Sequence, residues 1–261
     1  MDYVSPKEVA NNMLGLAIEK SSLKIKDLLI RGALSGALLG IAVTLAYLVT
    51  AQTKLSVIGA LLFPVGFIIV VLLGSELATG SCCLLPLAWF EKKISFNTML
   101  KNLFWVFLGN LVGSLLYAFL FWLSSSDLNG PIEQLLIKAA EKKTIGYKAN
   151  GFSGVFTAFV KGLLCNWMVC MGVVMAMTSK STLGKIFAGG IPIFIFFSLG
   201  FEHAVVKMFV IPAGMLFGAK VTFVEWWLYN QLIVTLGNLI GGLLFTGMAI
   251  YYTHTSVSKQ K

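Results

Sequence analysis

Two carboxylates and a histidine are the residues of this sequence best placed to do chemistry. Glu76 and Glu202 each stand in a Gly-x-Glu-x-Ala motif inside a long apolar stretch, and His203 directly follows the second glutamate. Ionisable groups in apolar segments are costly, and histidine titrates nearest neutrality. Such groups could brace an irregular backbone or relay a proton. Because one motif lacks the histidine, the sequence favours bracing for the glutamates. For His203 it favours a pore-facing role over a neutral histidine bonded to backbone.

No motif for a metal centre or an enzyme active site accompanies these residues. An intramembrane enzyme needs a nucleophile with its base, or a metal cluster, and one histidine among scattered carboxylates supplies neither. The cysteines have no zinc spacing and no disulfide framework, and we interpret them as small apolar residues: Cys82, Cys83, Cys165 and Cys170. We therefore expect no catalytic residue, no metal and no cofactor.

The composition places these side chains in a membrane. Hydrophobic residues make up 57% of the chain, charged residues 12%, and the mean hydropathy is +0.86, whereas about 25% of residues are charged in soluble domains. A simple span needs roughly 20 apolar residues. We therefore expect an all-α integral membrane protein with six transmembrane helices, in the segments 28–49, 57–89, 102–123, 155–178, 186–217 and 226–252.

The positive charge of the chain indicates orientation rather than a nucleic-acid partner. The net charge is +9, and lysine and arginine are more frequent on the side of the two termini than on the other side. Cytoplasmic loops carry such an excess. We expect a multi-pass protein of the inner (plasma) membrane, with both termini cytoplasmic and with lipid as its surroundings.

The sequence divides into one channel domain and two short flanking segments. Residues 1–27 precede the domain, which spans 28–252, and residues 253–261 form a cytoplasmic tail. Ser5 is a good helix cap, and the apolar residues that follow recur on one helical face. This pattern predicts an amphipathic helix over 6–20 on the cytoplasmic membrane surface.

The two Gly-x-Glu-x-Ala motifs predict breaks in the middle of the second and fifth transmembrane helices. Prolines flank both motifs: Pro64, Pro86, Pro192 and Pro212. A break within a membrane is tolerated only where it is buried in protein or lines a cavity. Paired breaks at the bilayer midplane are typical of a transport site, and the half-helix N-termini that meet there favour an anion. We expect Glu76 and Glu202 to accept hydrogen bonds from the free N–H groups at these breaks.

An internal repeat relates the two halves of the chain. Residues 108–116 and 236–244 share the pattern Leu-Gly-Asn-Leu-x-Gly-x-Leu-Leu at an offset of 128. Each half holds three crossings, an odd number, so the halves must insert in opposite orientations. We therefore expect an inverted 3+3 repeat over about 28–123 and 155–252.

Other polar residues in the spans leave more than one role open. Thr79 offers its hydroxyl either to the first break or to the backbone. Lys207 lies one helical turn after His203 and faces either the pore or a protein interface. By default we interpret three buried asparagines as contacts between helices: Asn110, Asn166 and Asn238.

Taken together, these motifs resemble the formate/nitrite transporter family. The resemblance covers nearly the whole chain and rests on GSELATG at 74–80, LCNWMVC at 164–170, GFEHA at 200–204 and LGNLIGG at 236–242. It implies an aquaporin-like six-helix protomer, assembled as a pentamer, with one anion path through each protomer.

The resemblance also implies roles for individual residues. His203 matches the central histidine, Thr79 its partner at the opposite break, and Asn166 a polar residue near the path. Lys148 resembles a vestibule lysine that attracts anions. The apolar constriction residues that it implies are Phe63, Phe67, Leu77, Val169 and Phe196.

Three residues depart from the usual family pattern. Ala78 and Ser81 replace the phenylalanine and the asparagine of Glu-Leu-Phe-Thr-Gly-Asn, and Lys207 stands where a neutral residue is common. The family divides among formate, nitrite, hydrosulfide and lactate, and the small Ala78 favours the hydrosulfide branch.

We therefore expect a membrane channel that passes small monovalent anions of weak acids: hydrosulfide, formate or nitrite. Two alternatives stay open. One is a neutral-solute channel of the aquaglyceroporin type, although neither break contains Asn-Pro-Ala. The other is a proton-coupled monocarboxylate transporter.

Overall fold

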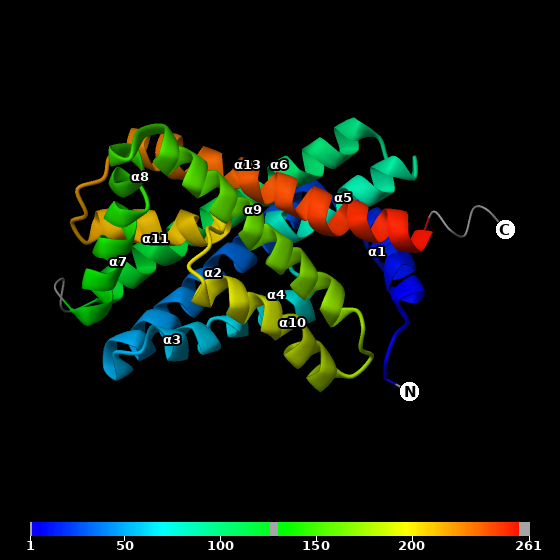
Figure 1. Cartoon of the computed structure of the whole chain (residues 1–261), viewed down its shortest axis with the longest axis horizontal. Helices are drawn as coiled ribbons and strands as arrows, with labels where there is room; N and C mark the ends of the chain where they lie inside the picture. Colours follow the sequence, from blue (N-terminus) through cyan, green and yellow to red (C-terminus); the bar gives the residue numbers. More distant parts are fainter. Residues whose placement is uncertain (1, 126–129, 256–261) are drawn as a thin grey trace.

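The computed structural model describes residues 2–125 and 130–255, and these residues fold almost entirely into helices (Figure 1). Four helical runs are long and apolar enough to cross a membrane: α2 (Ile25–Thr53), α6 (Phe96–Ser124), α9 (Gly151–Ala176) and Phe223–His254. The last run contains π-helical turns and consists of α12 (Phe223–Trp226), η1 (Trp227–Gln231), α13 (Leu232–Gly242), η2 (Leu243–Met248) and η3 (Tyr251–Thr255). Most of the predicted tail, residues 256–261, lies outside the described residues.

Two further apolar stretches are divided into shorter helices. The first contains α3 (Ser56–Leu62), α4 (Pro64–Leu72) and α5 (Ala78–Phe90), and the second contains α10 (Thr182–Ser198) and α11 (Ala204–Leu216). The interruptions after α4 and after α10 lie at the two Gly-x-Glu-x-Ala motifs. We call them the Glu76 break and the Glu202 break.

Glycine ends the helix at each break. Gly74 and Gly200 have φ angles of +60° and +66°, which side chains with a Cβ rarely adopt. At the Glu76 break the N–H of Ser75 donates to the carbonyl of Val70 at 3.0 Å, and at the Glu202 break Phe201 donates to Phe196 at 3.1 Å. These bonds satisfy carbonyls that the helix ends would otherwise leave free.

The prolines that flank the motifs do not make the breaks. Pro86, Pro192 and Pro212 lie inside helices, and Pro64 is the first residue of α4. Proline at the first helical position is compatible with a helix, because the N–H that it lacks would have no partner there.

The repeated Leu-Gly-Asn pattern serves close helix packing. Helix α2 packs along α6, and α9 packs along α13. A Cβ built on Gly113 would lie 1.8 Å from the carbonyl oxygen of Ala33, and one on Gly241 would lie 2.1 Å from that of Leu163. Both pairs of helices therefore approach so closely that only glycine fits, as is common between membrane helices.

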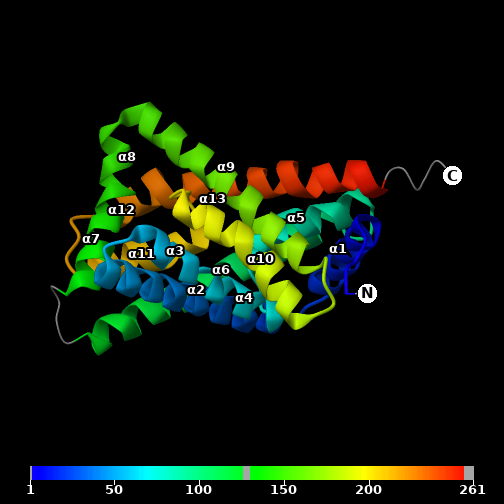
Figure 2. The ribbon, with the colours of Figure 1, turned by 60° about the horizontal axis from the view of Figure 1, so that its bottom comes forward.

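Two amphipathic helices lie at opposite ends of the molecule (Figures 1 and 2). Helix α1 (Pro6–Ser21) packs against α5, and α7 (Pro131–Lys142), which continues into α8 (Ile145–Ala149), packs against α11. Ser5 caps α1 as predicted, accepting from the N–H of Glu8 at 3.3 Å. The expectation for its apolar face needs correction, because that face is buried against α5 rather than turned to a membrane surface.

Candidate functional site

The two breaks are each held by one asparagine side chain. At the Glu76 break, Asn110 accepts from the N–H of Ala78 at 3.0 Å and donates to the carbonyls of Gly32 and Glu76 at 2.8 and 2.9 Å. Its amide therefore joins α2, the break and the start of α5. Asn110 is fully buried, so these backbone groups depend on its side chain rather than on solvent for their hydrogen bonds.

The Glu202 break has the same set of contacts. Asn238 accepts from the N–H of Ala204 at 2.9 Å and donates to the carbonyls of Gly162 and Glu202 at 2.7 and 2.9 Å. The asparagines thus do more than join two helices, because each one also caps a half-helix. Sequence reasoning missed this capping role, although the offset of 128 between the two asparagines was its signal.

The N-termini of the two half-helices meet at a contact between Thr79 and His203. The Thr79 hydroxyl oxygen lies 3.0 Å from His203 Nε2, and both side chains are buried. His203 Nδ1 accepts from the N–H of Val206 at 3.2 Å. Because Nδ1 acts as an acceptor, the imidazole is neutral and carries its proton on Nε2, which donates to Thr79. The ring stacks on Phe196 with centroids 5.7 Å apart.

Asn166 lies directly behind this contact. Its Nδ2 donates to the carbonyl of Thr79 at 3.0 Å and to the carbonyl of Asn238 at 2.6 Å. The residue is fully buried. It therefore links both halves of the chain at the point where the half-helices meet, and the sequence-based interpretation of a contact between helices holds in this respect.

The two glutamates bind lysines rather than the free N–H groups that we expected. Glu76 pairs with Lys20, at the end of α1, at 2.7 Å. The Glu202 carboxylate pairs with Lys143 at the end of α7, and its Oε1 also accepts from Tyr147 at 2.8 Å. Both carboxylates are almost completely buried. The expected hydrogen bonds are wrong because Asn110 and Asn238 already occupy the first N–H groups of the half-helices.

The two lysines that pair with the glutamates are held by matching contacts. The side chain of Asn102 donates to the carbonyl of Lys20 at 2.7 Å, and that of Asn230 donates to the carbonyl of Lys143 at 2.9 Å. Sequence reasoning missed both lysines because they lie outside the apolar segments. Asn102 and Asn230 repeat at the offset of 128, and this repeat was the available signal.

Lys148 is not located at either break. Its ammonium pairs with Glu225 at 2.9 Å, lies over the ring of Tyr229, and its side chain is 49% exposed. The hydrogen bond and the charge of Glu225 raise the pKa of Lys148. The lysine of this end that reaches a break is Lys143, and the vestibule role that the family resemblance implies for Lys148 stays a prediction. Lys207, which the sequence left open, is buried and faces Glu202 at 3.5 Å.

The predicted constriction residues belong to one buried hydrophobic cluster that also contains Val205 and Val206. All are 5% exposed or less: Phe63, Phe67, Leu77, Val169 and Phe196. The rings of Phe63 and Phe196 meet edge to face at 5.8 Å. An apolar layer thus lies next to the His203 ring.

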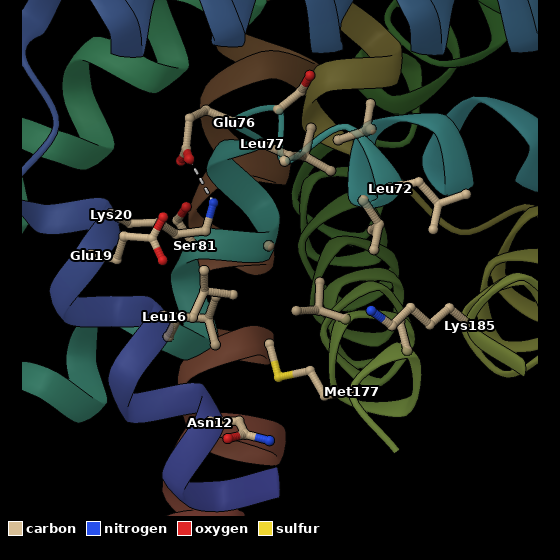
Figure 3. Close-up of a pocket in the computed structure, with 18 of the residues that line it drawn as sticks. Asn12, Leu16, Glu19, Lys20, Leu72, Glu76, Leu77, Ser81, Met177 and Lys185 are labelled. Carbon is tan, nitrogen blue, oxygen red and sulfur yellow. Dashed lines mark hydrogen bonds and ion pairs between the residues drawn. The ribbon is translucent and has the colours of Figure 1, made fainter. Parts of the chain in front are cut away.

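A cavity of about 560 Å³ opens on the α1 side of this apolar layer. Figure 3 shows the ion pair of Lys20 and Glu76 in its wall, with Leu77 and Ser81 nearby. Phe67 and Leu77 contribute to its wall. This cavity, the α1 vestibule, has both polar and apolar walls and therefore reaches the apolar layer that lies next to the His203 ring. Among residues 2–125 and 130–255, no cluster of side chains suited to a metal ion is found.

Comparison with known proteins shows similarity along nearly the whole chain. A family profile described as "Formate/nitrite transporter" matches residues 7–252. The chain is 33% identical to "Probable formate transporter" of Methanothermobacter thermautotrophicus, with 97% of each protein covered. The solved structure "FNT family ion channel" superposes with a TM-score of 0.84 at 26% identity, covering 94% of this chain and 98% of that one. The structure "Pentameric formate channel with formate bound" superposes with a TM-score of 0.72 at 27% identity, covering 87% and 96%.

Proposed function

Because this chain belongs to the formate/nitrite transporter family, whose members are transporters and channels rather than enzymes, we propose that it passes small monovalent anions of weak acids across a membrane. Formate, nitrite and hydrosulfide are the candidate substrates, and the small Ala78 at the Glu76 break favours hydrosulfide. Each protomer would contain its own path.

The observation that carries this proposal is the meeting of two half-helix N-termini at Thr79 and His203. Helices α5 and α11 both begin at this point, 13 residues long each. Their N-terminal ends carry partial positive charge, and the Nε2–H of His203 is a donor in an apolar surrounding. An anion that has lost its water gains most from these groups, since donors to a charged partner are worth more than donors to a neutral one.

The remaining expectations on architecture become parts of this proposal. The four long helical runs and the two interrupted stretches would together give six crossings, if each interrupted stretch crosses the membrane once. The two halves of the chain would then have opposite orientations, and both breaks would lie at the bilayer midplane. Helix α1 packs against η3, so the first and last described helices lie at the same end of the molecule. This supports both termini on the cytoplasmic side of the inner membrane. The pentameric assembly of a structural relative supports a pentamer.

The path that we propose runs from the α1 vestibule through the apolar layer to the Glu202 break. The apolar layer would exclude hydrated ions, and the central donors would compensate an anion for the water that it loses there. Asn166 would position Thr79, and Glu76 and Glu202 would hold the breaks through their lysines. Lys143 would hold the Glu202 break, and the exposed Lys148 would attract anions at the far mouth.

The experiment compares His203→Phe with the parent in liposomes. Phenylalanine keeps the bulk of the ring and its stacking on Phe196, but it removes the donor. We expect formate, nitrite or hydrosulfide flux to fall roughly 10- to 100-fold, the value of one hydrogen bond to a charged group. His254→Phe, which changes the other histidine of the chain, is the matched control and should keep the parent rate.

Two outcomes would favour the alternatives. Glycerol flux as fast as formate flux in the parent would indicate a neutral-solute channel. Proton uptake in step with each anion would indicate proton-coupled transport. An assembled His203→Phe protein that conducts at the parent rate would contradict the central role of the histidine.

A further inference from the structure

A buried lysine beside the Glu202 break has no role in the path proposed so far. Lys207 lies in the first turn of α11, one turn after His203, and is 7% exposed. Its backbone N–H donates to the His203 carbonyl at 3.1 Å. A buried ammonium is costly unless an opposite charge and hydrogen-bond acceptors compensate it. What compensates Lys207 therefore decides its role.

Glu202 gives Lys207 only part of this compensation. Its carboxylate already pairs with Lys143 and accepts from Tyr147 through Oε1. Lys207 reaches the other oxygen, Oε2, at 3.5 Å. Among the ion pairs within residues 2–125 and 130–255, Glu202 is the carboxylate partner of both lysines. Two positive charges, the buried Lys207 and the half-buried Lys143, thus share one negative charge.

The ammonium group of Lys207 also has N–H donors without a short hydrogen bond to Glu202. An ammonium has three N–H donors. Charge-assisted N–H···O bonds are about 2.7–2.9 Å long, so the 3.5 Å contact with Glu202 is a loose one. A further acceptor with a negative charge would satisfy both the surplus charge and the free donors.

The Glu76 break does not carry this surplus. Glu76 pairs with one lysine, Lys20, at 2.7 Å. The offset of 126 between the two glutamates places Ser81 where the Glu202 break has Lys207. Ser81 is buried and carries a neutral hydroxyl. The excess positive charge is therefore particular to the break that contains His203.

We propose that Lys207 is a substrate-binding residue that holds a small monovalent anion beside His203 and makes the path prefer the anion to its protonated, neutral acid. The inference rests on the proposed function and adds a site to it. Two other groups near this break do not compensate the surplus positive charge. The carbonyl of Lys161 accepts from the N–H of Glu202 at 3.2 Å, but its side chain is itself a cation. The imidazole of His203 is neutral.

The first test uses the unmodified protein in detergent and asks whether it binds an anion more tightly than a neutral molecule of the same shape. Formate should raise the apparent melting temperature in proportion to its binding, since a ligand that binds only the folded state stabilises it. Formamide, a neutral molecule of similar size, should give no comparable shift. Equal shifts with formate and formamide would overturn the proposal.

The second test compares Lys207→Met and Lys207→Arg with the parent in liposomes. The half-saturating formate concentration should rise about tenfold or more in Lys207→Met, because a unit charge buried near a bound anion is worth at least this much at an effective dielectric constant of about 20. Lys207→Arg should stay within about threefold of the parent, because it keeps the charge. Lys138→Met, which removes an exposed lysine of α7, is the matched control and should behave as the parent.

The outcomes separate this proposal from the proposed function. If the parent passes no anion, the proposed function fails. If the parent conducts formate and an assembled Lys207→Met protein keeps the parent half-saturation, the inference alone fails. A purely structural lysine would lower the melting temperature and the maximal rate but leave half-saturation and the formate-dependent shift unchanged, and this result would also overturn it.

Discussion

Replacing Asn238 by alanine should loosen the Glu202 break more than any other single hydrogen-bonding change there. The substitution removes three hydrogen bonds, to Ala204, Gly162 and Glu202, of 2.7–2.9 Å. Hydrogen bonds between membrane helices average about 0.6 kcal/mol and reach about 1.7 kcal/mol, so three amount to about 2–5 kcal/mol. For a chain of this size each kcal/mol shifts the melting temperature by about 2–4 °C, which predicts a decrease of roughly 4–20 °C.

The assay is the apparent melting temperature of the purified protein in detergent, followed by tryptophan fluorescence. Asn110→Ala should give a similar decrease, because it removes the corresponding three bonds at the Glu76 break. Asn150→Ala, which removes one exposed bond to the carbonyl of Gly146, is the control and should change the melting temperature by about 2 °C or less. If the melting temperature of Asn238→Ala also changed by about 2 °C or less, the view that this amide holds the break would be refuted.

Two further predictions concern packing and surface charge. Gly113→Ala should destabilise the protein by about 1–3 kcal/mol or more, because its Cβ would lie 1.8 Å from the Ala33 carbonyl oxygen, whereas Gly15→Ala, with open space around it, should be neutral or stabilising in the same melting assay. Lys148→Met should leave the pH profile of formate flux between pH 5 and 9 unchanged. Since Glu225 raises the pKa of Lys148, the stabilising charge is fully present below the ordinary lysine pKa of 10.5 and is lost only as the pH rises above it. A profile altered within pH 5 to 9 would contradict a Lys148 that stays charged throughout this range.

The breaks and the pairing of the two halves could be predicted because they leave local marks in the sequence. A glutamate between glycine and alanine in an apolar stretch is rare without a structural reason, and it occurs at matching positions in both halves. The Leu-Gly-Asn-Leu pattern is local in the same way. It contains a glycine that allows close helix packing and, next to it, an asparagine whose side chain caps a half-helix. The contact between Thr79 and His203 came from the family resemblance, because nothing local joins residues 124 positions apart.

The lysine partners of the glutamates could not be predicted in this way. Lys20 and Lys143 lie in amphipathic segments whose placement depends on tertiary packing against α5 and α11. A charge in such a segment is as compatible with solvent as with a buried partner. The flanking prolines do not mark where the breaks lie, since a proline within a helix is tolerated where neighbouring groups satisfy the freed carbonyl.

The position of Lys20 changes how the beginning of the chain should be treated in the laboratory. A terminal helix that packs on the outside of a bundle is an obvious segment to shorten when a membrane protein is prepared for crystallisation. Here a protein that begins at Ser22 would lose the counter-charge of Glu76 and the carbonyl that Asn102 binds. Its behaviour would describe a protein with a buried carboxylate that has lost its lysine partner at the Glu76 break.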